Sequence, residues 1–217
     1  MPMFDERAAP LYVLLAALFI GALVTANLIA SKIILVGGLV VPAGVLAYSI
    51  TFVVTDVICE IWGKRATQAV VNAGFAVLLL SWVLVALAIR MPAAPFWQNQ
   101  EAFAGVLGSA NRIILASLVA YAVSQTLDVW GFQRIKELTR GRMLWVRNNT
   151  ATMLSQTVDS AIFVTIAFYG VAPVLQIIAG QLVVKYVIAL CDTPFVYAGV
   201  WLVRARLGAP VRARAEA

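Results

Sequence analysis

Histidine is absent from this chain, and cysteine occurs only twice. Without histidine the chain lacks the usual general base, the usual zinc ligand and any Ser-His-Asp triad, which argues against most membrane hydrolases. Cys59 and Cys191 lie in or beside apolar runs without metal-ligand spacing, so neither a disulfide nor a zinc site is indicated. No G-x-x-x-x-G-K-[ST] phosphate loop occurs, so the chain does not hydrolyse ATP by the usual route. The sequence therefore predicts no catalytic residue, no cofactor and no bound metal.

Charge is also scarce, and apolar residues dominate. Charged residues make up 12% of the 217 residues, hydrophobic ones 63%, and the mean hydropathy is +0.94, far outside the usual soluble range. The net charge of +6 would suit nucleic acid, but the basic residues fall in short loops between apolar segments, where they orient a protein in the bilayer. We therefore predict one polytopic membrane domain over residues 1–217, with lipid around it and no nucleic-acid partner.

The apolar runs predict six transmembrane helices. A bilayer core of about 30 Å needs about 20 helical residues, which places the spans near 11–35, 40–61, 67–89, 112–131, 150–169 and 178–203. Gly37, Gly38 and Pro42 predict a tight first hairpin, and residues 91–108 are long enough to lie on the membrane surface. The first span is too long for the apolar region of a signal peptide.

The basic residues predict the orientation. Most of them fall on one side of the predicted spans: Arg7, Lys64, Arg65, Arg134, Lys136, Arg140, Arg142, Arg147, Arg204, Arg206, Arg212 and Arg214. Only Arg90 and Arg112 fall in the opposite loops. By the positive-inside rule both termini are expected in the cytoplasm.

The stretch Leu154–Phe163, LSQTVDSAIF, carries Ser155, Gln156 and Asp159 inside an apolar run. Ser155 and Gln156 lie four and three residues before Asp159, so they share a helix face with it. A carboxylate in a membrane helix needs partners, water or a ligand, and it is a functional-site hypothesis by default. A polar network that only serves packing is the alternative interpretation.

A near copy, VSQTLDVWGF, covers Val123–Phe132 and repeats the pattern as Ser124, Gln125 and Asp128. Lipid exposure does not favour S-Q-T-x-D. We therefore expect the two helices to face one another.

Other spans carry polar residues as well. The first span holds Asn27 near Lys32, whose side chain could equally reach the membrane interface, and the second holds Asp56. In the last span Gln181, Lys185 and Asp192 form one stripe, and Pro194 can kink the helix beside Asp192. A structural pair between Lys185 and an Asp of another helix is the alternative here. Together these residues outline a polar track across the membrane, which is typical of a transporter.

Four ordered blocks carry a resemblance to a known family: TDVICEIWGKR, SQTLD, SQTVDSAIF and KYVIALCDTPFVY. From Asn27 to Tyr197 the chain resembles the queuosine precursor transporter family, also called the vitamin uptake transporter family. The resemblance implies a bacterial inner-membrane protein that imports the 7-deazaguanine bases preQ0 and preQ1. It also implies a six-helix, all-α fold like that of the substrate-binding subunits of energy-coupling-factor vitamin transporters.

The residue chemistry is compatible with such a small planar heterocycle. A guanine-like base presents two adjacent N–H donors, which a carboxylate such as Asp159 or Asp192 can accept together. Lys185, Gln156 or Gln125 could donate to its carbonyl, and an aromatic ring would stack on it. The predicted substrate-binding residues are Asn27, Lys32, Asp56, Gln125, Asp128, Gln156, Asp159, Lys185 and Asp192.

Several alternatives stay open at this point. The chain could be the binding subunit of a multi-component importer that docks through Ala22, Ala26 and Ala30, whose spacing lets another helix approach closely. Proton coupling through the buried aspartates and facilitated diffusion are both compatible with the sequence, as are a monomer and a homodimer. A metal enzyme is disfavoured because the carboxylates are scattered.

Overall fold

The computed structural model is a mostly helical bundle with one small hairpin. It describes the backbone of residues 8–138 and 144–207, and the side chains of these ranges except 128–138, 144–152, 189, 190 and 193. Its elements are α1 (Ala8–Ile29), β1 (Ile33–Val36), β2 (Leu39–Pro42), α2 (Val45–Trp62), α3 (Lys64–Arg90), α4 (Gln100–Leu138), α5 (Leu144–Phe168), α6 (Val174–Cys191) and α7 (Thr193–Leu207).

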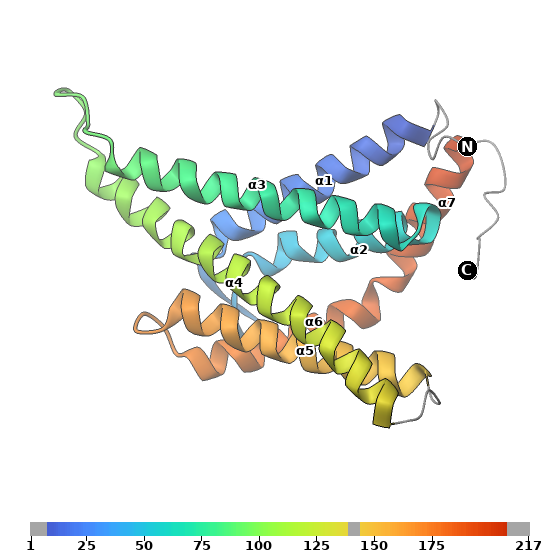
Figure 1. Cartoon of the computed structure of the whole chain (residues 1–217). Helices are drawn as coiled ribbons and strands as arrows, with labels where there is room; N and C mark the ends of the chain where they lie inside the picture. The colour runs from blue at the N-terminus through green and yellow to red at the C-terminus, as the bar shows by residue number, and fades with distance from the viewer. Residues whose placement is uncertain (1–7, 139–143, 208–217) are drawn as a thin grey trace.

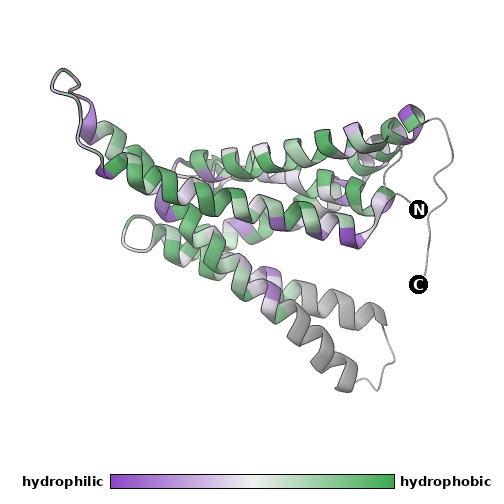
Figure 2. Cartoon of the chain, turned by 45° about the horizontal axis from the view of Figure 1, so that its top comes forward, coloured by the Kyte–Doolittle hydropathy of each residue, from purple (hydrophilic) through white to green (hydrophobic). Residues whose placement is uncertain are grey.

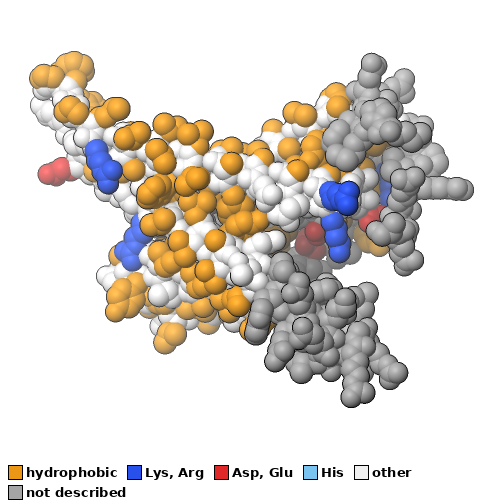
Figure 3. All heavy atoms as spheres, viewed as in Figure 1, with side chains coloured by type: hydrophobic (Ala, Val, Ile, Leu, Met, Phe, Trp, Pro, Cys, Tyr) orange, Lys and Arg blue, Asp and Glu red, His pale blue; other side chains and the backbone are white. Residues whose placement is uncertain are grey.

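Within the described residues, four helices are long and apolar enough to cross a membrane. They are α1, α2, α3 and the part Gln100–Leu127 of α4, whereas the described apolar parts of α5 and α6 are shorter. Figure 2 shows apolar residues along most of these helices, and Figure 3 shows them spread over the described part of the face in view. An apolar surface of this extent fits hydrocarbon rather than water.

The ends of the helices gather at two levels. Figure 1 shows the start of α1, the α2–α3 turn and the end of α7 at one end of the molecule, and the α3–α4 connection at the other. Only Gly63 separates α2 from α3, and its φ of 83° lies in the left-handed region that favours glycine. This single residue reverses the chain between two long helices.

The first predicted span is wrong at its C-terminal end. It was expected to run to residue 35, but α1 ends at Ile29 and an antiparallel hairpin follows, with Ile33 opposite Pro42 and Val36 opposite Leu39. Gly37 and Gly38, at φ 56° and 84°, form its two-residue turn. The β-branched residues on either side of Gly-Gly are a hairpin pattern, so the all-α prediction also needs this correction.

Two other predicted boundaries differ. Residues 91–108 were expected on the membrane surface, but α4 begins at Gln100 and leaves only residues 91–99 as a connection. The predicted last span is divided at Asp192 into α6 and α7, and Figure 1 shows α7 turning away from α6 toward the end of α2. Pro194 lies two positions after Asp192. Its nitrogen carries no hydrogen and cannot donate to a carbonyl of the preceding turn, which explains why the helix breaks here. The predicted kink is therefore confirmed.

Two clusters of buried side chains join most of the helices, and a third, of Val57, Val200 and Val203, joins α2 to α7. The first joins α1, α2, α3 and α4 through Phe19, Leu23, Val54, Ile58, Ala66, Val70, Leu78 and Ile114. The second joins α4, α5 and α6 with the end of α1 through Ala30, Ile113, Ala116, Val164, Ala167, Phe168 and Ile177. Because α4 takes part in both clusters, it connects the two halves of the molecule.

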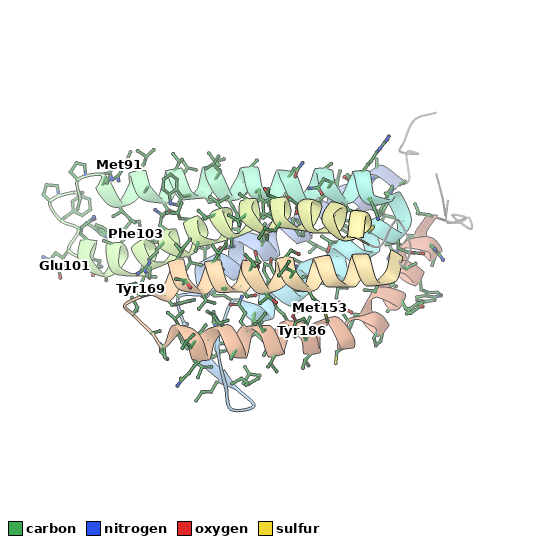
Figure 4. All side chains as sticks on the ribbon, turned by 60° about the horizontal axis from the view of Figure 1, so that its bottom comes forward. Met91, Glu101, Phe103, Met153, Tyr169 and Tyr186 are labelled. Atoms are coloured by element: carbon green, nitrogen blue, oxygen red, sulfur yellow. The ribbon has the colours of Figure 1, made fainter. Side chains whose placement is uncertain are left out.

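The expected contact between the two S-Q-T-x-D helices is confirmed. α4 and α5 pack against each other, and Figure 4 shows them side by side from Met153 to the end of α5 near Tyr169. At that end Arg112 of α4 donates to the carbonyls of Ile166 (2.7 Å) and Tyr169 (2.8 Å). The guanidinium thus satisfies carbonyls that the last turn of a helix leaves unpaired.

The hairpin packs on α6 at Gly180. A Cβ added to Gly180 would collide with the Val40 carbonyl, whereas one added to Gly108 of α4 would have no neighbour within 4 Å. Gly180→Ala should therefore cost about 1 to 3 kcal/mol of stability through overpacking, while Gly108→Ala should be neutral or gain up to about 1 kcal/mol in helix propensity. Thermal unfolding in detergent measures both, and equal stability of the two variants would contradict the packing described here.

Candidate functional site

A cavity lies between the two halves of the bundle, which are α1 to α3 on one side and α5 and α6 on the other, with α4 joining them. The empty space between its walls, open mouth included, is about 770 Å³. Six helices and the end of the hairpin line it, with Leu23, Ala26, Asn27, Ala30, Pro42, Gly44, Val45, Tyr48, Phe52, Phe75, Leu78, Ser117, Ala120, Tyr121, Asp159, Phe163, Gln181, Lys185 and Ile188. The wall is therefore mostly apolar and aromatic, with a few polar groups.

An ion pair between α5 and α6 supplies the charge of the cavity. Lys185 Nζ lies 2.9 Å from Asp159 Oδ2, and the whole Lys185 residue is only 7% exposed. The same ammonium donates to Ser160 Oγ at 2.9 Å and to Gln156 Oε1 at 3.5 Å. Asp159 and Ser160 lie three and four residues after Gln156, so the three acceptors share one face of α5. All three N–H bonds of the ammonium thus have acceptors, as burial of the charge requires.

Asp159 also contacts α4. Ser124 Oγ lies 3.4 Å from Asp159 Oδ1 and 3.2 Å from the Tyr121 carbonyl, so its hydroxyl has an acceptor on either side. The first residue of one S-Q-T-x-D stretch therefore meets the aspartate of the other. A carboxylate has about four acceptor positions, so Asp159 keeps capacity for a ligand.

Aromatic rings line the cavity that holds the ion pair. Lys185 Nζ lies 5.9 Å from the centroid of the Tyr48 ring, within cation–π distance, and Tyr48 meets Phe52 edge to face at 5.2 Å. Phe75 of α3 and Tyr121 of α4 are stacked at an interplanar angle of 16°. The sequence did not indicate which rings would lie at the site, because helix positions alone do not say which faces meet.

Asn27 is buried on the α1 side of the cavity. Its Nδ2 donates to the Leu23 carbonyl at 2.8 Å, and its Oδ1 accepts from Ser117 Oγ at 2.6 Å. Both ends of the amide are therefore paired inside the protein.

The structure brings only part of the predicted set to the cavity. Asn27, Asp159 and Lys185 line it, and Gln156 contacts Lys185. The remaining predicted residues lie elsewhere in the described part of the chain, or their side chains are outside it, as the next two paragraphs describe.

Lys32 and Gln125 have exposed side chains and do not line the cavity. The Lys32 carbonyl accepts from Ala43 N–H at 2.8 Å at the base of the hairpin. The exposure of Lys32 fits the alternative in which its ammonium reaches the membrane interface.

Asp56 and Asp192 form a second acidic location. Asp56 is exposed on α2, and Asp192 is half-buried at the α6–α7 break. The two carboxylates are close enough for their negative charges to repel each other. Neither lines the cavity. Asp128 belongs to α4, but its side chain lies outside the described residues. In the described part of the chain these residues therefore do not share the cavity with Asp159 and Lys185, and the polar track across the membrane stays a prediction.

Sequence reasoning missed several cavity residues. Ser117 and the rings of Tyr48, Phe75, Tyr121 and Phe163 carry no pattern that separates them from packing residues. Ser160 does not line the cavity but contacts Lys185, and its place directly after Asp159 could have indicated this. Gln181 was placed on the Lys185 stripe but was not counted among the predicted substrate-binding residues.

A family model described as "Putative vitamin uptake transporter" matches residues 42–199 of the chain. The match covers the helices that carry most of the cavity. The chain belongs to this family.

Curated relatives of this vitamin uptake transporter have names that agree with the family. A Bacillus subtilis (strain 168) protein named "Probable queuosine precursor transporter" is 34% identical over 82% of this chain and 79% of its own length. An Escherichia coli (strain K12) protein named "Queuosine precursor transporter" is 29% identical over 58% of this chain and 54% of its own length. No solved structure matches the chain. The protein is thus a multi-pass membrane transporter and not an enzyme.

The ion pair of this transporter gives a stability prediction. Lys185→Met leaves the Asp159 carboxylate without its counter-charge and should cost about 3 to 5 kcal/mol, the usual result of breaking a buried pair from one side. Asp159→Asn in the same chain removes the charge and should recover part of the loss. Thermal unfolding of the single and double variants in detergent measures the coupling.

The exposed pair between Arg204 and Glu60, at 3.2 Å, provides the matched control. Arg204→Met should cost no more than about 1 kcal/mol, as for other exposed pairs. An effect of Lys185→Met as small as this would show that the pair with Asp159 does not stabilise the bundle.

Proposed function

We propose that this chain imports a queuosine precursor, a free 7-deazaguanine base such as preQ0 or preQ1, across the bacterial inner membrane. The observation that carries the proposal is the ion pair of Lys185 and Asp159 inside an aromatic-walled cavity between the two halves of the bundle. The names of the relatives from Bacillus subtilis and Escherichia coli support the same substrate class.

The chemistry of the base fits the groups in the cavity. Its N1–H and 2-amino group are adjacent donors, which the Asp159 carboxylate accepts together. The Lys185 ammonium donates to the ring carbonyl in place of Gln156 Oε1, which at 3.5 Å is the most distant of its three acceptors. A flat aromatic ligand gains further from contact with the rings that line the cavity.

The proposed topology has six crossings with both termini in the cytoplasm. α1 to α5 each cross once, and α6 and α7 together make the sixth crossing, bent at Asp192. The positive-inside distribution of Lys and Arg supports this orientation. In it, the hairpin and residues 91–99 face the outside.

A binding subunit of a multi-component importer is the second candidate, and it fits the structure less well. Ala26 and Ala30, two of the three small residues proposed to dock a partner, are each 4% exposed. A Cβ added to Gly44 would meet the Ala26 carbonyl and the Ala30 side chain, so this small-residue stripe already serves a close approach within the chain. We therefore favour transport by the chain alone.

Uptake of labelled preQ0 and preQ1 by the purified protein in liposomes tests the proposal. Saturable uptake is expected, with guanine and a panel of vitamins as competitors. Tight binding without uptake would instead favour the binding-subunit alternative. Comparison of uptake with and without an imposed pH gradient separates proton coupling from facilitated diffusion.

Asp159→Asn should weaken binding of the base about 10- to 100-fold, because a charge-assisted hydrogen bond becomes a neutral one. Glu101→Gln is the matched control, since Glu101 is exposed in the first turn of α4 near the α3–α4 connection (Figure 4). Equal uptake by wild type and Asp159→Asn would remove Asp159 from the site.

A further inference from the structure

Gln181 presents a buried acceptor that has no donor among the described residues. Its Oε1 atom is inaccessible to solvent and makes no hydrogen bond, yet the residue lines the cavity. An amide oxygen out of water loses free energy unless it is hydrogen-bonded. Because Gln181 lines the cavity, rotation of its terminal amide would present this oxygen to a ligand there and satisfy it.

Gln181 differs from two other buried amides of the bundle, Asn27 and Asn111, in its hydrogen bonding or in its position. Asn27 lines the same cavity, but both ends of its amide are paired within the protein. Asn111 of α4 also has a buried Oδ1 without a donor in the described part of the chain, but it does not line the cavity. Gln181 alone combines both properties among the cavity-lining residues described.

The position of Gln181 is fixed by the hairpin. Its neighbour Gly180 lies against the Val40 carbonyl and the Val41 side chain, so β2 holds this turn of α6. Gln181 is four positions before Lys185, which is about 6 Å along a helix. Gln181 therefore lies one turn beyond the ion pair, a separation comparable to the length of a fused two-ring base.

We infer that Gln181 accepts a hydrogen bond from the pyrrole N–H of a free 7-deazaguanine base, so that the site selects free bases over their nucleosides. This inference rests on the proposed function, in which Asp159 holds the N1–H and 2-amino edge. The pyrrole N–H belongs to the other ring of the base, on the side away from that edge. In a nucleoside this nitrogen carries the ribose and has no hydrogen to donate.

A ligand that lacks only this donor tests the inference on the unmodified protein. The analogue with a ring oxygen in place of the pyrrole N–H keeps the shape and the edge that Asp159 would bind. Wild type should bind preQ0 about tenfold or more tightly than its ring-oxygen analogue, the loss expected for one unmade hydrogen bond. Equal affinities for the two compounds would overturn the inference.

Gln181→Met adds a second, independent measurement. Methionine keeps the length of the side chain but has no amide, so preQ0 should bind about tenfold more weakly while the affinity for the analogue stays unchanged. The melting temperature without ligand should stay equal or rise, because an unpaired buried oxygen has been removed. A variant that binds preQ0 as wild type does would contradict the proposed role.

Asn111→Leu is the matched control, because it removes the other unpaired buried amide oxygen. It should leave the affinities for both compounds unchanged. Failure of wild type to bind any 7-deazaguanine base would overturn the proposed function and this inference together. Binding of preQ0 and its analogue with equal affinity would overturn only the inference.

Discussion

The bundle depends on the compensation of one buried positive charge. An ammonium at low dielectric is costly unless a counter-charge and hydrogen-bond acceptors surround it, and Lys185 finds these in Asp159, Gln156 and Ser160. All three belong to one face of α5, so the requirement of Lys185 determines how α5 and α6 face each other. Ser124 extends the same network to α4. The charge and its partners thus bring three helices to one place.

Small residues allow the two halves to close around that place. Gly44 approaches the Ala26 backbone, and Gly180 approaches the Val40 backbone. In lipid, helices gain little from hydrophobic association, so close packing of small residues contributes much of their attraction. The hairpin takes part in this packing although it is not a helix. Its paired strands satisfy their facing backbone groups, which a membrane environment demands.

The cavity combines chemical features that suit a neutral, flat and polar molecule. One carboxylate and one ammonium balance each other, several rings provide apolar surface, and Gln181 adds an acceptor beyond the pair. A family placement alone does not specify a ligand, because related folds carry different substrates. If Asp159 and Gln181 both bind the ligand, as we propose, the site favours ligands with hydrogen-bond donors on two edges.

The sequence by itself determined the membrane class, the polar stretches and the meeting of the two S-Q-T-x-D helices, because composition and helical spacing are local properties of a chain. It also indicated Asp159 and Lys185, since charges in apolar runs stand out without any structure. Only the tertiary structure decided that Lys185 pairs with Asp159 and that Lys32 and Gln125 lie outside the cavity. It also decided that Gln181 Oε1 has no hydrogen-bond donor among the described residues. Those properties depend on which helix faces meet, and a repeat of 3.6 residues does not specify the partner of a face. The tight turn at Gly37 and Gly38 was predicted, but the two β-strands beside it were missed for a related reason: hydropathy alone does not distinguish a β-branched strand from the end of an apolar helix.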